Sequence, residues 1–354
     1  MTLEQLLEKE NLRNTPYEVF INLKDSIDDI EILSEICTYI DFENHEAFYA
    51  SVNRFFIQYG KKLSIANSTE ITKTLVGNNF DHNIYSEKII SAFGRPVILV
   101  INDTIESSID TIWKKRIHDS KANIDTAIPS VGRIEIKNHS RFDWVGTGWL
   151  IKGTNIVVTN RHVADTFASR RENSFDIYAN HMGKTLEVSI DFKEEYNIND
   201  EKTFKIKRVL HMTENDEPDI ALLEVYDKSC EGESLPLGLE IATHKSKYDN
   251  EVFVIGYPGK NSMYRDEFFN EIFDVKRLAP GIISPSSAAS FIYAHDCSTW
   301  HGNSGSPVIE LDSGEVIGVH YGGSDNNIIG KQGSNWAVSS TYLIDLLNEL
   351  KIAY

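Results

Sequence analysis

From about residue 128 onward the sequence is a succession of short apolar segments separated by Gly, Asn, Asp and Ser. These segments include VGRIEI, WVGTGWLI, NIVVTN, TFKIKRVL, IALLEV, EVFVIGYP, SPVIEL and EVIGVHYG. Many short strands with frequent turn residues are typical of an all-β barrel or sandwich. This pattern predicts one all-β domain over residues 126–354. Leucines at helical spacing near its end predict a terminal amphipathic helix; they are Leu343, Leu346, Leu347 and Leu350.

The N-terminal part, residues 1–92, has helical rather than strand periodicity. Between His45 and Gly60 the apolar residues recur at helical spacing, and Gly60 stands where a helix would end. The stripe consists of Phe48, Val52, Phe55, Phe56 and Tyr59. We expect a small α-helical bundle here, because no His, Cys or charged cluster in this segment suggests chemistry. By analogy with helical modules fused to other enzymes, it is expected to act as an adaptor or sensor that binds a protein partner.

Residues 93–125 are expected to connect the two parts. Arg95 begins a short apolar run, Pro-Val-Ile-Leu-Val-Ile, with strand character. Apolar residues at helical spacing follow it and predict a helix; they are Ile105, Ile109, Ile112, Trp113 and Ile117.

Composition excludes several classes of function. The chain has 53 acidic against 35 basic residues, a net charge of −18, which argues against a nucleic-acid-binding surface and against anionic membranes. No secretory signal and no apolar run long enough to span a membrane is visible. The cysteines Cys37, Cys230 and Cys297 are odd in number and far apart, so neither a disulfide scaffold nor a zinc site is expected. These features favour a cytoplasmic protein with free thiols.

Two polar residues at strand ends have the chemistry of a general base and its partner. His162 follows the segment Asn155-Ile-Val-Val-Thr-Asn-Arg and opens a short turn. An imidazole titrates near neutral pH and offers two distinct nitrogens, as a general base requires. Asp219 immediately precedes the apolar strand Ile-Ala-Leu-Leu-Glu-Val. A carboxylate partly buried there needs a partner, and it can orient the imidazole.

A third motif, His301-Gly-Asn-Ser-Gly-Ser-Pro-Val, supplies a nucleophile in a glycine-flanked turn. Ser304 is the candidate nucleophile. Such a turn lets the backbone N–H groups of Gly302 and Ser304 point together and stabilise the oxyanion of an acyl-transfer intermediate. Glycine is required at position 302 because a side chain would obstruct the approach and the backbone angles.

Taken in order, Gly-Thr-Gly-Trp-Leu-Ile, Thr-Asn-Arg-His-Val-Ala, Asp-Ile-Ala-Leu-Leu and Gly-Asn-Ser-Gly-Ser-Pro resemble the trypsin/chymotrypsin superfamily over residues of about 125 to 354. The resemblance implies an all-β domain of two six-stranded antiparallel barrels behind the α-helical bundle, an α+β multidomain chain. His162 and Asp219 would come from the first barrel and Ser304 from the second. It also implies a serine endopeptidase that hydrolyses proteins or peptides through an acyl-enzyme, with no metal and no organic cofactor.

Within that superfamily the sequence around the pocket is most similar to bacterial glutamyl endopeptidases. The resemblance implies that Thr299 and His320 hold the acidic side chain of the substrate, with Tyr321 and Gly322 on the same strand. An imidazole N–H and a hydroxyl can donate to a carboxylate or to an amide oxygen, so Glu is the expected preference, with Gln or Asp next. Ser298 stands where cleavage after Lys or Arg would need a carboxylate. The alternative is that His320 is only a strand residue satisfied by its neighbours.

Asn303, directly before the candidate nucleophile, bears on how such an enzyme would be activated. Trypsin has an Asp at the place of Asn303, and an amide cannot form the ion pair that activates trypsin. Regulation is therefore expected through the N-terminal helical domain, as in some bacterial defence proteins. Two other functions are open at this stage: a catalytically silent scaffold that binds peptides, and a nucleic-acid sensor. The intact set of His162, Asp219 and Ser304 disfavours the first, and the acidic charge disfavours the second.

Overall fold

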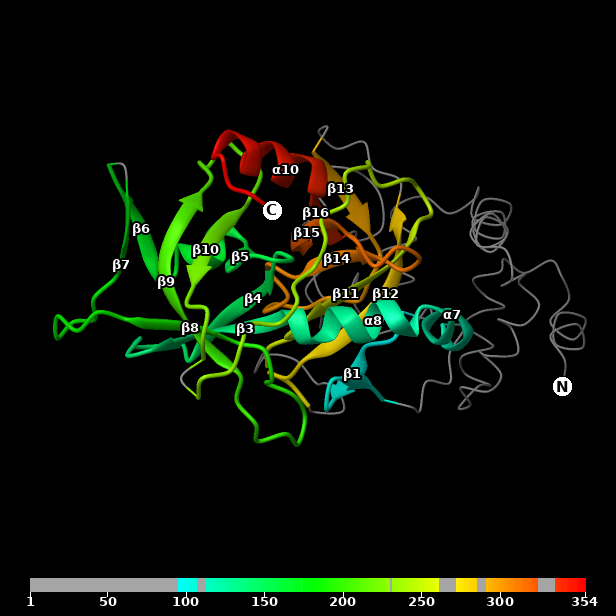
Figure 1. The fold of residues 1–354 in the computed structure, drawn as a ribbon, viewed down its shortest axis with the longest axis horizontal. Helices are drawn as coiled ribbons and strands as arrows, with labels where there is room; N and C mark the ends of the chain where they lie inside the picture. Colours follow the sequence, from blue (N-terminus) through cyan, green and yellow to red (C-terminus); the bar gives the residue numbers. More distant parts are fainter. Residues whose placement is uncertain are drawn as a thin grey trace, which may run out of the picture. The chain divides into compact units, whose positions relative to one another are not determined.

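The computed structural model describes residues 95–106, 113–172, 174–229, 231–260, 272–284, 291–323 and 335–354. The helical bundle and the adaptor role predicted for residues 1–92 lie outside the described residues, as do Cys37 and Cys230. The described chain begins just before the cyan strand β1 and ends after the red helix α10 (Figure 1).

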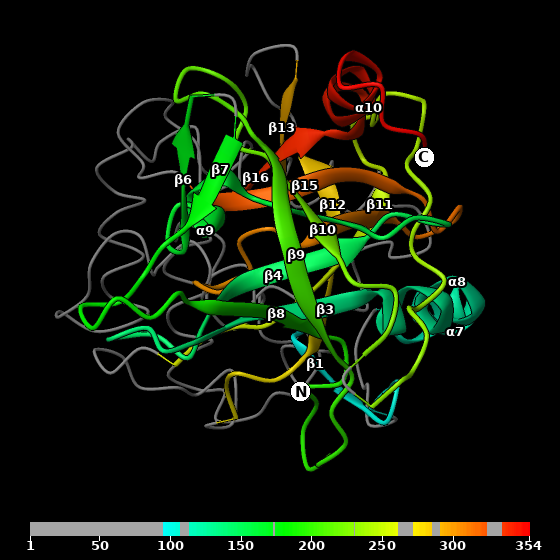
Figure 2. The same cartoon turned by 60° about the vertical axis from the view of Figure 1, so that its left-hand side comes forward.

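The first barrel is a closed ring of six antiparallel strands in the order β10-β5-β4-β3-β8-β9. The strands are β3 (Val131–Lys137), β4 (Trp144–Leu150), β5 (Ile156–Thr159), β8 (Glu187–Asp191), β9 (Thr203–Met212) and β10 (Ala221–Val225). β9 crosses the front of this barrel in Figure 2, with the hairpin of β6 (Ala168–Arg171) and β7 (Ser174–Ile177) beside it. Apolar residues from all six strands form its core. The inward-facing side chains of a small closed barrel are expected to fill its interior in this way.

Two facing glycines make room inside this barrel. Gly132 of β3 pairs with Gly148 of β4. A Cβ at Gly132 would lie 2.5 Å from Cγ1 of Ile190, and one at Gly148 would lie 2.8 Å from Cγ1 of Val157. Larger residues at either position would displace the buried side chains, so the Gly-Thr-Gly segment is required for packing as well as for the site.

The second barrel is a ring of six antiparallel strands with an appended hairpin. Its strands are β11 (Glu251–Gly256), β12 (Arg277–Ser284), β13 (Ile292–His295), β14 (Pro307–Glu310), β15 (Val316–Gly323) and β16 (Asn335–Ser339). They pair in the order β11-β14-β15-β16-β13-β12, and β11 also pairs with β12, which closes the ring. The predicted pair of six-stranded barrels is therefore confirmed.

The segment before the barrels is a hairpin docked on the second one. β1 (Ile98–Ile101) pairs with β12 and with β2 (Thr104–Ile105). Asn102 and Asp103 form its turn with φ of 52° and 58°, the positive values that a two-residue hairpin turn needs. The expected strand after Arg95 is confirmed.

The helix expected to run from Ile105 to Ile117 was partly wrong. Ile105 lies in β2, where it pairs with Val100, and the helices are α7 (Lys114–Asp119) and α8 (Lys121–Ala127), followed by the 3₁₀ helix η1 (Ile128–Ser130). Ile105 leaves the helical series because a turn at Asn102 and Asp103 favours pairing with β1. Ile109 and Ile112 lie outside the described residues, and Trp113 and Ile117 are buried.

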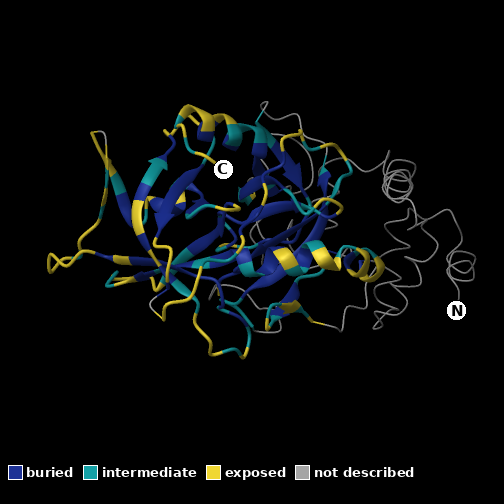
Figure 3. Cartoon of the chain, in the orientation of Figure 1, coloured by how far each residue is buried: buried dark blue, intermediate teal, exposed yellow. Residues whose placement is uncertain are grey.

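The predicted terminal helix is confirmed as α10 (Ser340–Glu349). The hydroxyl of Ser339 caps it by accepting the N–H of Thr341. Leu343, Leu346 and Leu347 are buried, and Figure 3 shows the opposite face exposed. In the part of the chain that the structure describes, no helix is both long and apolar enough to cross a membrane.

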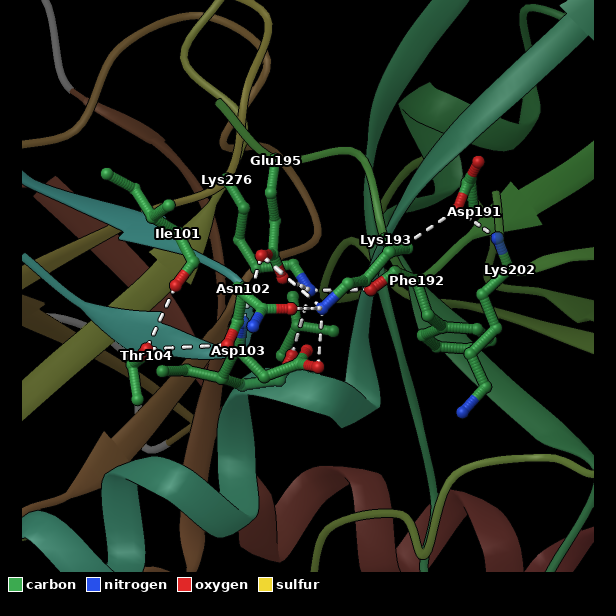
Figure 4. Close-up of polar contacts among 12 residues, drawn as sticks. Ile101, Asn102, Asp103, Thr104, Asp191, Phe192, Lys193, Glu195, Lys202 and Lys276 are labelled. Carbon is green, nitrogen blue, oxygen red and sulfur yellow. Dashed lines mark hydrogen bonds and ion pairs between the residues drawn. The ribbon is translucent and has the colours of Figure 1, made fainter. Parts of the chain in front are cut away.

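A buried charge network fixes the junction between the two barrels (Figure 4). Lys276, fully buried just before β12, donates from Nζ to the carbonyls of Ile128 (3.0 Å) and Phe192 (2.7 Å). Its Nζ also lies 3.5 Å from Oε1 of Glu195, whose side chain is likewise fully buried. Lys193 pairs with Asp103 at 2.5 Å, which extends the network to the β1–β2 turn. Burial lowers the pKa of Lys276 to about 8, although Glu195 and then Asp103 act in the opposite direction.

Lys276→Met is expected to lower the free energy of unfolding by about 3–5 kcal/mol at pH 7, because it removes the cation beside the buried Glu195 carboxylate and the donor to two buried carbonyls. Chemical denaturation measures the loss. Since the pKa of Lys276 is lower in the folded chain than its usual 10.5, the free energy of unfolding of the wild type should rise relative to the variant between pH 8 and pH 10.5.

Lys207→Met is the matched control for this prediction. Lys207 makes a comparable ion pair with Glu224 at 2.8 Å, but its side chain is 46% exposed. Solvent-exposed pairs contribute about 1 kcal/mol or less. Equal losses in the two variants would contradict a structural role for the buried network.

Candidate active site

The candidate base lies in a one-turn helix at the end of the first barrel's β5. Residues Arg161–Ala164 form α9, and His162 is its second residue. Asn160, fully buried before the helix, donates from Nδ2 to the backbone carbonyl of Asp219 at 2.8 Å. This bond ties the start of the helix to the segment that carries the candidate carboxylate.

Asp219 reaches His162 because β5 and β10 are paired. Ala221 lies opposite Thr159, so the residues flanking that pair meet at the same end of the barrel. Oδ2 of Asp219 lies 2.5 Å from Nδ1 of His162, and Oδ1 accepts the backbone N–H of His162 at 3.1 Å. The two contacts fix both the position and the tilt of the imidazole, and they leave its Nε2 facing away from the carboxylate.

The charge of Asp219 is stabilised by this arrangement. Burial by itself raises the pKa of Asp219, but the hydrogen bond and charge of the His162 ring and the backbone N–H of His162 outweigh it, so the pKa is lowered from 3.8. Asp219 is therefore ionised at neutral pH. A partly buried carboxylate on Nδ1 stabilises an imidazolium and holds the proton on the nitrogen that faces it.

The Ser304 turn has the backbone form expected of it. Gly302 and Gly305 have φ of +94° and +90°, values that favour glycine. A Cβ at Gly302 would lie 2.3 Å from the carbonyl oxygen of Tyr257, so no other residue fits there. The N–H of Gly305 donates to the carbonyl of His320 at 2.9 Å, which anchors the turn on β15.

The first barrel also holds this turn, through Thr147 of β4. The Thr147 hydroxyl donates to the carbonyl of Gly302 at 2.8 Å, and the Thr147 N–H donates to the carbonyl of Ser304 at 2.9 Å. At the neighbouring Gly146, a Cβ would lie 2.8 Å from Val163 and 3.1 Å from the carbonyl oxygen of Ser304. Val163 follows His162 directly, so the His162 segment and the Ser304 turn both pack against β4 at Gly146.

Two backbone donors of the turn are available to a ligand. The N–H groups of Asn303, Gly305 and Ser306 bond to carbonyls of the protein. Those of Gly302 and Ser304 make no hydrogen bond with any residue that the structure describes. Backbone N–H groups are seldom left without a partner, and a developing oxyanion is a suitable acceptor for both.

The predicted pocket residue His320 is buried in β15 and contacts a second histidine. Its Nδ1 lies 3.1 Å from Nε2 of His295, the last residue of β13. Burial, followed by the charges of His295 and His162, holds the pKa of His320 well below 6.5, against a backbone contact with Trp336 that raises it. Burial lowers the pKa of His295 to about 4. Both rings are therefore neutral at pH 7.

The other predicted pocket residues differ in their surroundings. Thr299 is buried, and its hydroxyl has no hydrogen-bond partner among the described residues. Tyr321 and Gly322 are half-buried on β15, beyond His320. Burial and then the charge of Asp219 raise the pKa of Tyr321 to about 12. The hydroxyl of Ser298 donates to the carbonyl of Arg95 at 2.8 Å.

Asn303 is satisfied within its own turn. It is buried, and its Nδ2 donates to the carbonyl of Trp300 at 3.0 Å.

One group of possible metal ligands occurs among the described residues, and it includes none of His162, Asp219 and Ser304. Glu135, Asp191 and Glu194 place ligand atoms within 4.8 Å of one another. Arg133 pairs with both glutamates, and Asp191 accepts hydrogen bonds from backbone and hydroxyl donors, so protein groups already serve these carboxylates.

Four contributing residues were not assigned a role from the sequence. Thr147, Asn160 and Arg95 have no motif of their own that indicates their bonds. His295 likewise has no motif that indicates its contact with His320. Alternation along the Ile292–His295 strand shows which residues share a face, but the pairing of β13 and β15 on either side of β16, which brings His295 to His320, is not visible in the sequence.

A family model and a solved structure are each similar to part of this chain. Residues 146–319 match the family model described as a trypsin-like peptidase domain, and His162, Asp219 and Ser304 all lie within the match. That segment is therefore similar to trypsin-like peptidase domains. No curated protein matches the chain. Among solved structures, the serine endoprotease from Yersinia pestis is similar over 65% of this chain, with 16% identity and a TM-score of 0.44. The match spans 66% of that protein, just under two thirds of its length.

Proposed function

We propose that His162, Asp219 and Ser304 are the catalytic triad, and that the protein cleaves peptide bonds through an acyl-enzyme on Ser304. The observation that carries the proposal is the double contact of Asp219 with the ring and backbone of His162, at 2.5 Å and 3.1 Å. The bonds from Thr147 to the Ser304 turn support it, because they join the two halves of the machinery.

In this mechanism, His162 accepts the proton of the Ser304 hydroxyl on Nε2 as Oγ attacks the peptide carbonyl. Asp219 keeps the other proton on Nδ1 and stabilises the imidazolium. The N–H groups of Gly302 and Ser304 donate to the oxyanion, and His162 then returns the proton to the leaving amine. Water then attacks the acyl-enzyme while His162 accepts its proton, and His162 returns this proton to Oγ as Ser304 is released.

Labelling with a small fluorophosphonate tests this proposal. The reagent needs only an activated serine and an oxyanion hole, so labelling of Ser304 together with hydrolysis of peptides supports the triad. Peptide binding without labelling or hydrolysis would favour the scaffold function instead.

We further propose that the pocket prefers Glu, with Gln or Asp next. The buried hydroxyl of Thr299 has no partner among the described residues, and buried polar groups normally have one. His295 and His320 are neutral, so one nitrogen of each ring carries a proton. Nδ1 of His295 is buried and has no partner among the described residues, and a buried N–H donor without a partner is costly. We therefore assign the proton of His295 to Nε2, which donates to Nδ1 of His320. His320 then carries its proton on Nε2 and is a donor for a side-chain oxygen.

His320→Ala is expected to lower kcat/KM for peptides cleaved after Glu by on the order of 10- to 100-fold, the effect of losing a hydrogen bond to a charged group. Fluorophosphonate labelling should stay near the wild-type rate, because the reagent carries no side chain for the pocket. Since the pKa of His320 lies well below 6.5, the ratio of cleavage after Glu to cleavage after Gln should stay level from pH 6.5 upward. A wild-type preference for Lys, Arg or aromatic residues in a peptide library would contradict the pocket assignment.

A cytoplasmic location and regulation through residues 1–92 are also proposed, on the sequence alone. Fractionating cells that express the full chain tests the location. Comparing the activity of the full chain with that of a variant truncated before Arg95 tests the regulation.

A further inference from the structure

Arg95, ahead of the peptidase domain, lies buried against the segment that leads to the nucleophile. Only 2% of the residue is exposed. Its Nε donates to Oδ1 of Asp296 at 2.9 Å and its Nη2 to Oδ2 at 2.6 Å, a bidentate pair. The plane of a guanidinium matches that of a carboxylate, so this pair fixes orientation as well as distance.

The backbone of Arg95 holds the same segment at a second point. Its carbonyl oxygen accepts the hydroxyl of Ser298, which is itself buried. Asp296 and Ser298 flank Cys297, so the segment is held on both sides of one residue. Thr299, the proposed pocket residue, comes next in the chain.

The same segment also bonds to strands of the second barrel. Oδ1 of Asp296 also accepts the N–H of Ile282 at 2.7 Å, and the carbonyl of Cys297 accepts Nδ2 of Asn335 at 2.7 Å. Gly281 lets the segment pack closely on β12, since a Cβ there would lie 2.7 Å from Oδ1 of Asp296 and 2.7 Å from the N of Cys297. The Arg95 contacts are thus part of a packed support on which the pocket wall rests.

We propose that Arg95 is a positioning residue for the substrate pocket. It holds Asp296 and Ser298 so that Thr299 faces the substrate side chain, and it makes the segment ahead of the peptidase domain part of the specificity machinery. The inference rests on the proposed pocket. The Arg95 proposal does not depend on the preference for Glu. It concerns how firmly residues 296–299 are held, whichever substrate residue the pocket selects.

Arg95→Ala is expected to lower kcat/KM for the preferred peptide by on the order of 10- to 100-fold, the effect of small displacements of binding groups. Most of the loss should appear as a higher KM and a flatter preference in a peptide library. Labelling of Ser304 by the small fluorophosphonate should stay near the wild-type rate, because the nucleophile turn is held separately by Thr147 and His320. Added guanidinium ion should restore part of the lost selectivity by occupying the space beside Asp296.

Arg116→Ala is the matched control. Arg116 pairs with Glu251 at 2.8 Å and lies over the Trp113 ring at 5.3 Å, much as Arg95 lies over the same ring at 5.2 Å. Its acidic partner begins β11 rather than the segment before Ser304. We expect Arg116→Ala to lower the melting temperature but to keep the wild-type preference, with no rescue by guanidinium. Equal changes of selectivity in the two variants would overturn the proposal.

Hydrogen exchange gives a readout that does not depend on activity. Amides of residues 296–300 should exchange faster in Arg95→Ala than in the wild type, and at the wild-type rate in Arg116→Ala. Unchanged exchange in Arg95→Ala would overturn the proposal even if the pocket assignment holds. Arg95→Lys keeps the charge but cannot bind both carboxylate oxygens, so it should show the same loss in milder form and keeps the test available if Arg95→Ala fails to fold.

Discussion

Ser304→Ala should lower peptide hydrolysis by on the order of 10⁴-fold or more, because triad members act as a unit and the nucleophile has no substitute in the turn. The melting temperature should stay near that of the wild type. The turn is held through backbone groups, namely the carbonyls of Gly302 and Ser304 and the N–H of Gly305, and the substitution leaves all of them in place. Steady-state kinetics and thermal unfolding on the same preparation measure the two effects.

Ser306→Ala is the control for this prediction, since Ser306 is a second serine of the same turn. It is fully buried, and its Oγ has no hydrogen-bond partner among the described residues. Replacing it should keep both hydrolysis and fluorophosphonate labelling. Labelling that persists in Ser304→Ala and disappears in Ser306→Ala would reassign the nucleophile.

Asp219→Asn should fold and should lose turnover by about 10⁴-fold, since an amide in place of the carboxylate favours the wrong tautomer of His162. Peptide binding should change little, because Asp219 contacts the base rather than the proposed pocket residue Thr299. Asp165→Asn is the control. Asp165 lies three residues after His162 and 3.7 Å from Arg161, but its side chain is half exposed. It should retain nearly all activity.

The same variant has a pH signature in stability. The pKa of Asp219 is lower in the folded chain than its usual 3.8, so its charged form stabilises the fold above pH 3.8. This contribution is lost as the pH falls through the folded pKa. The difference in unfolding free energy between the wild type and Asp219→Asn should therefore be level from neutral pH to about pH 4 and shrink in stronger acid. A difference that grows with acid would contradict the ionised state assigned to Asp219.

The two barrels and the three catalytic candidates could be predicted because each depends on local sequence. Short strands and glycine turns are set by neighbouring residues, and His162, Asp219 and Ser304 each stand beside a strand end. The β1–β2 hairpin could not be separated from a helix, because Ile105 fits both patterns until the pairing with Val100 is known. The spacing of apolar residues in the sequence does not indicate which strands pair with one another.

The supporting residues escaped prediction for a related reason. Arg95 bonds to Asp296, 201 positions later, and Thr147 bonds to Gly302, 155 positions later. His295 meets His320 only across the closed second barrel. Such contacts arise when distant strands pack, and a single sequence gives no signal for them.

The bonds of Thr147 have a consequence for the order in which the enzyme is made. The first barrel, Val131 to Val225, is synthesised before the Ser304 turn. The hydrogen bond from Thr147 to Gly302 can therefore form only after the second barrel has been synthesised. Domains generally begin to fold as they are synthesised. A nascent chain that carries only the first barrel therefore has a base and a carboxylate but no nucleophile. If the proposed triad is correct, proteolytic activity should begin only once the second barrel closes on β4.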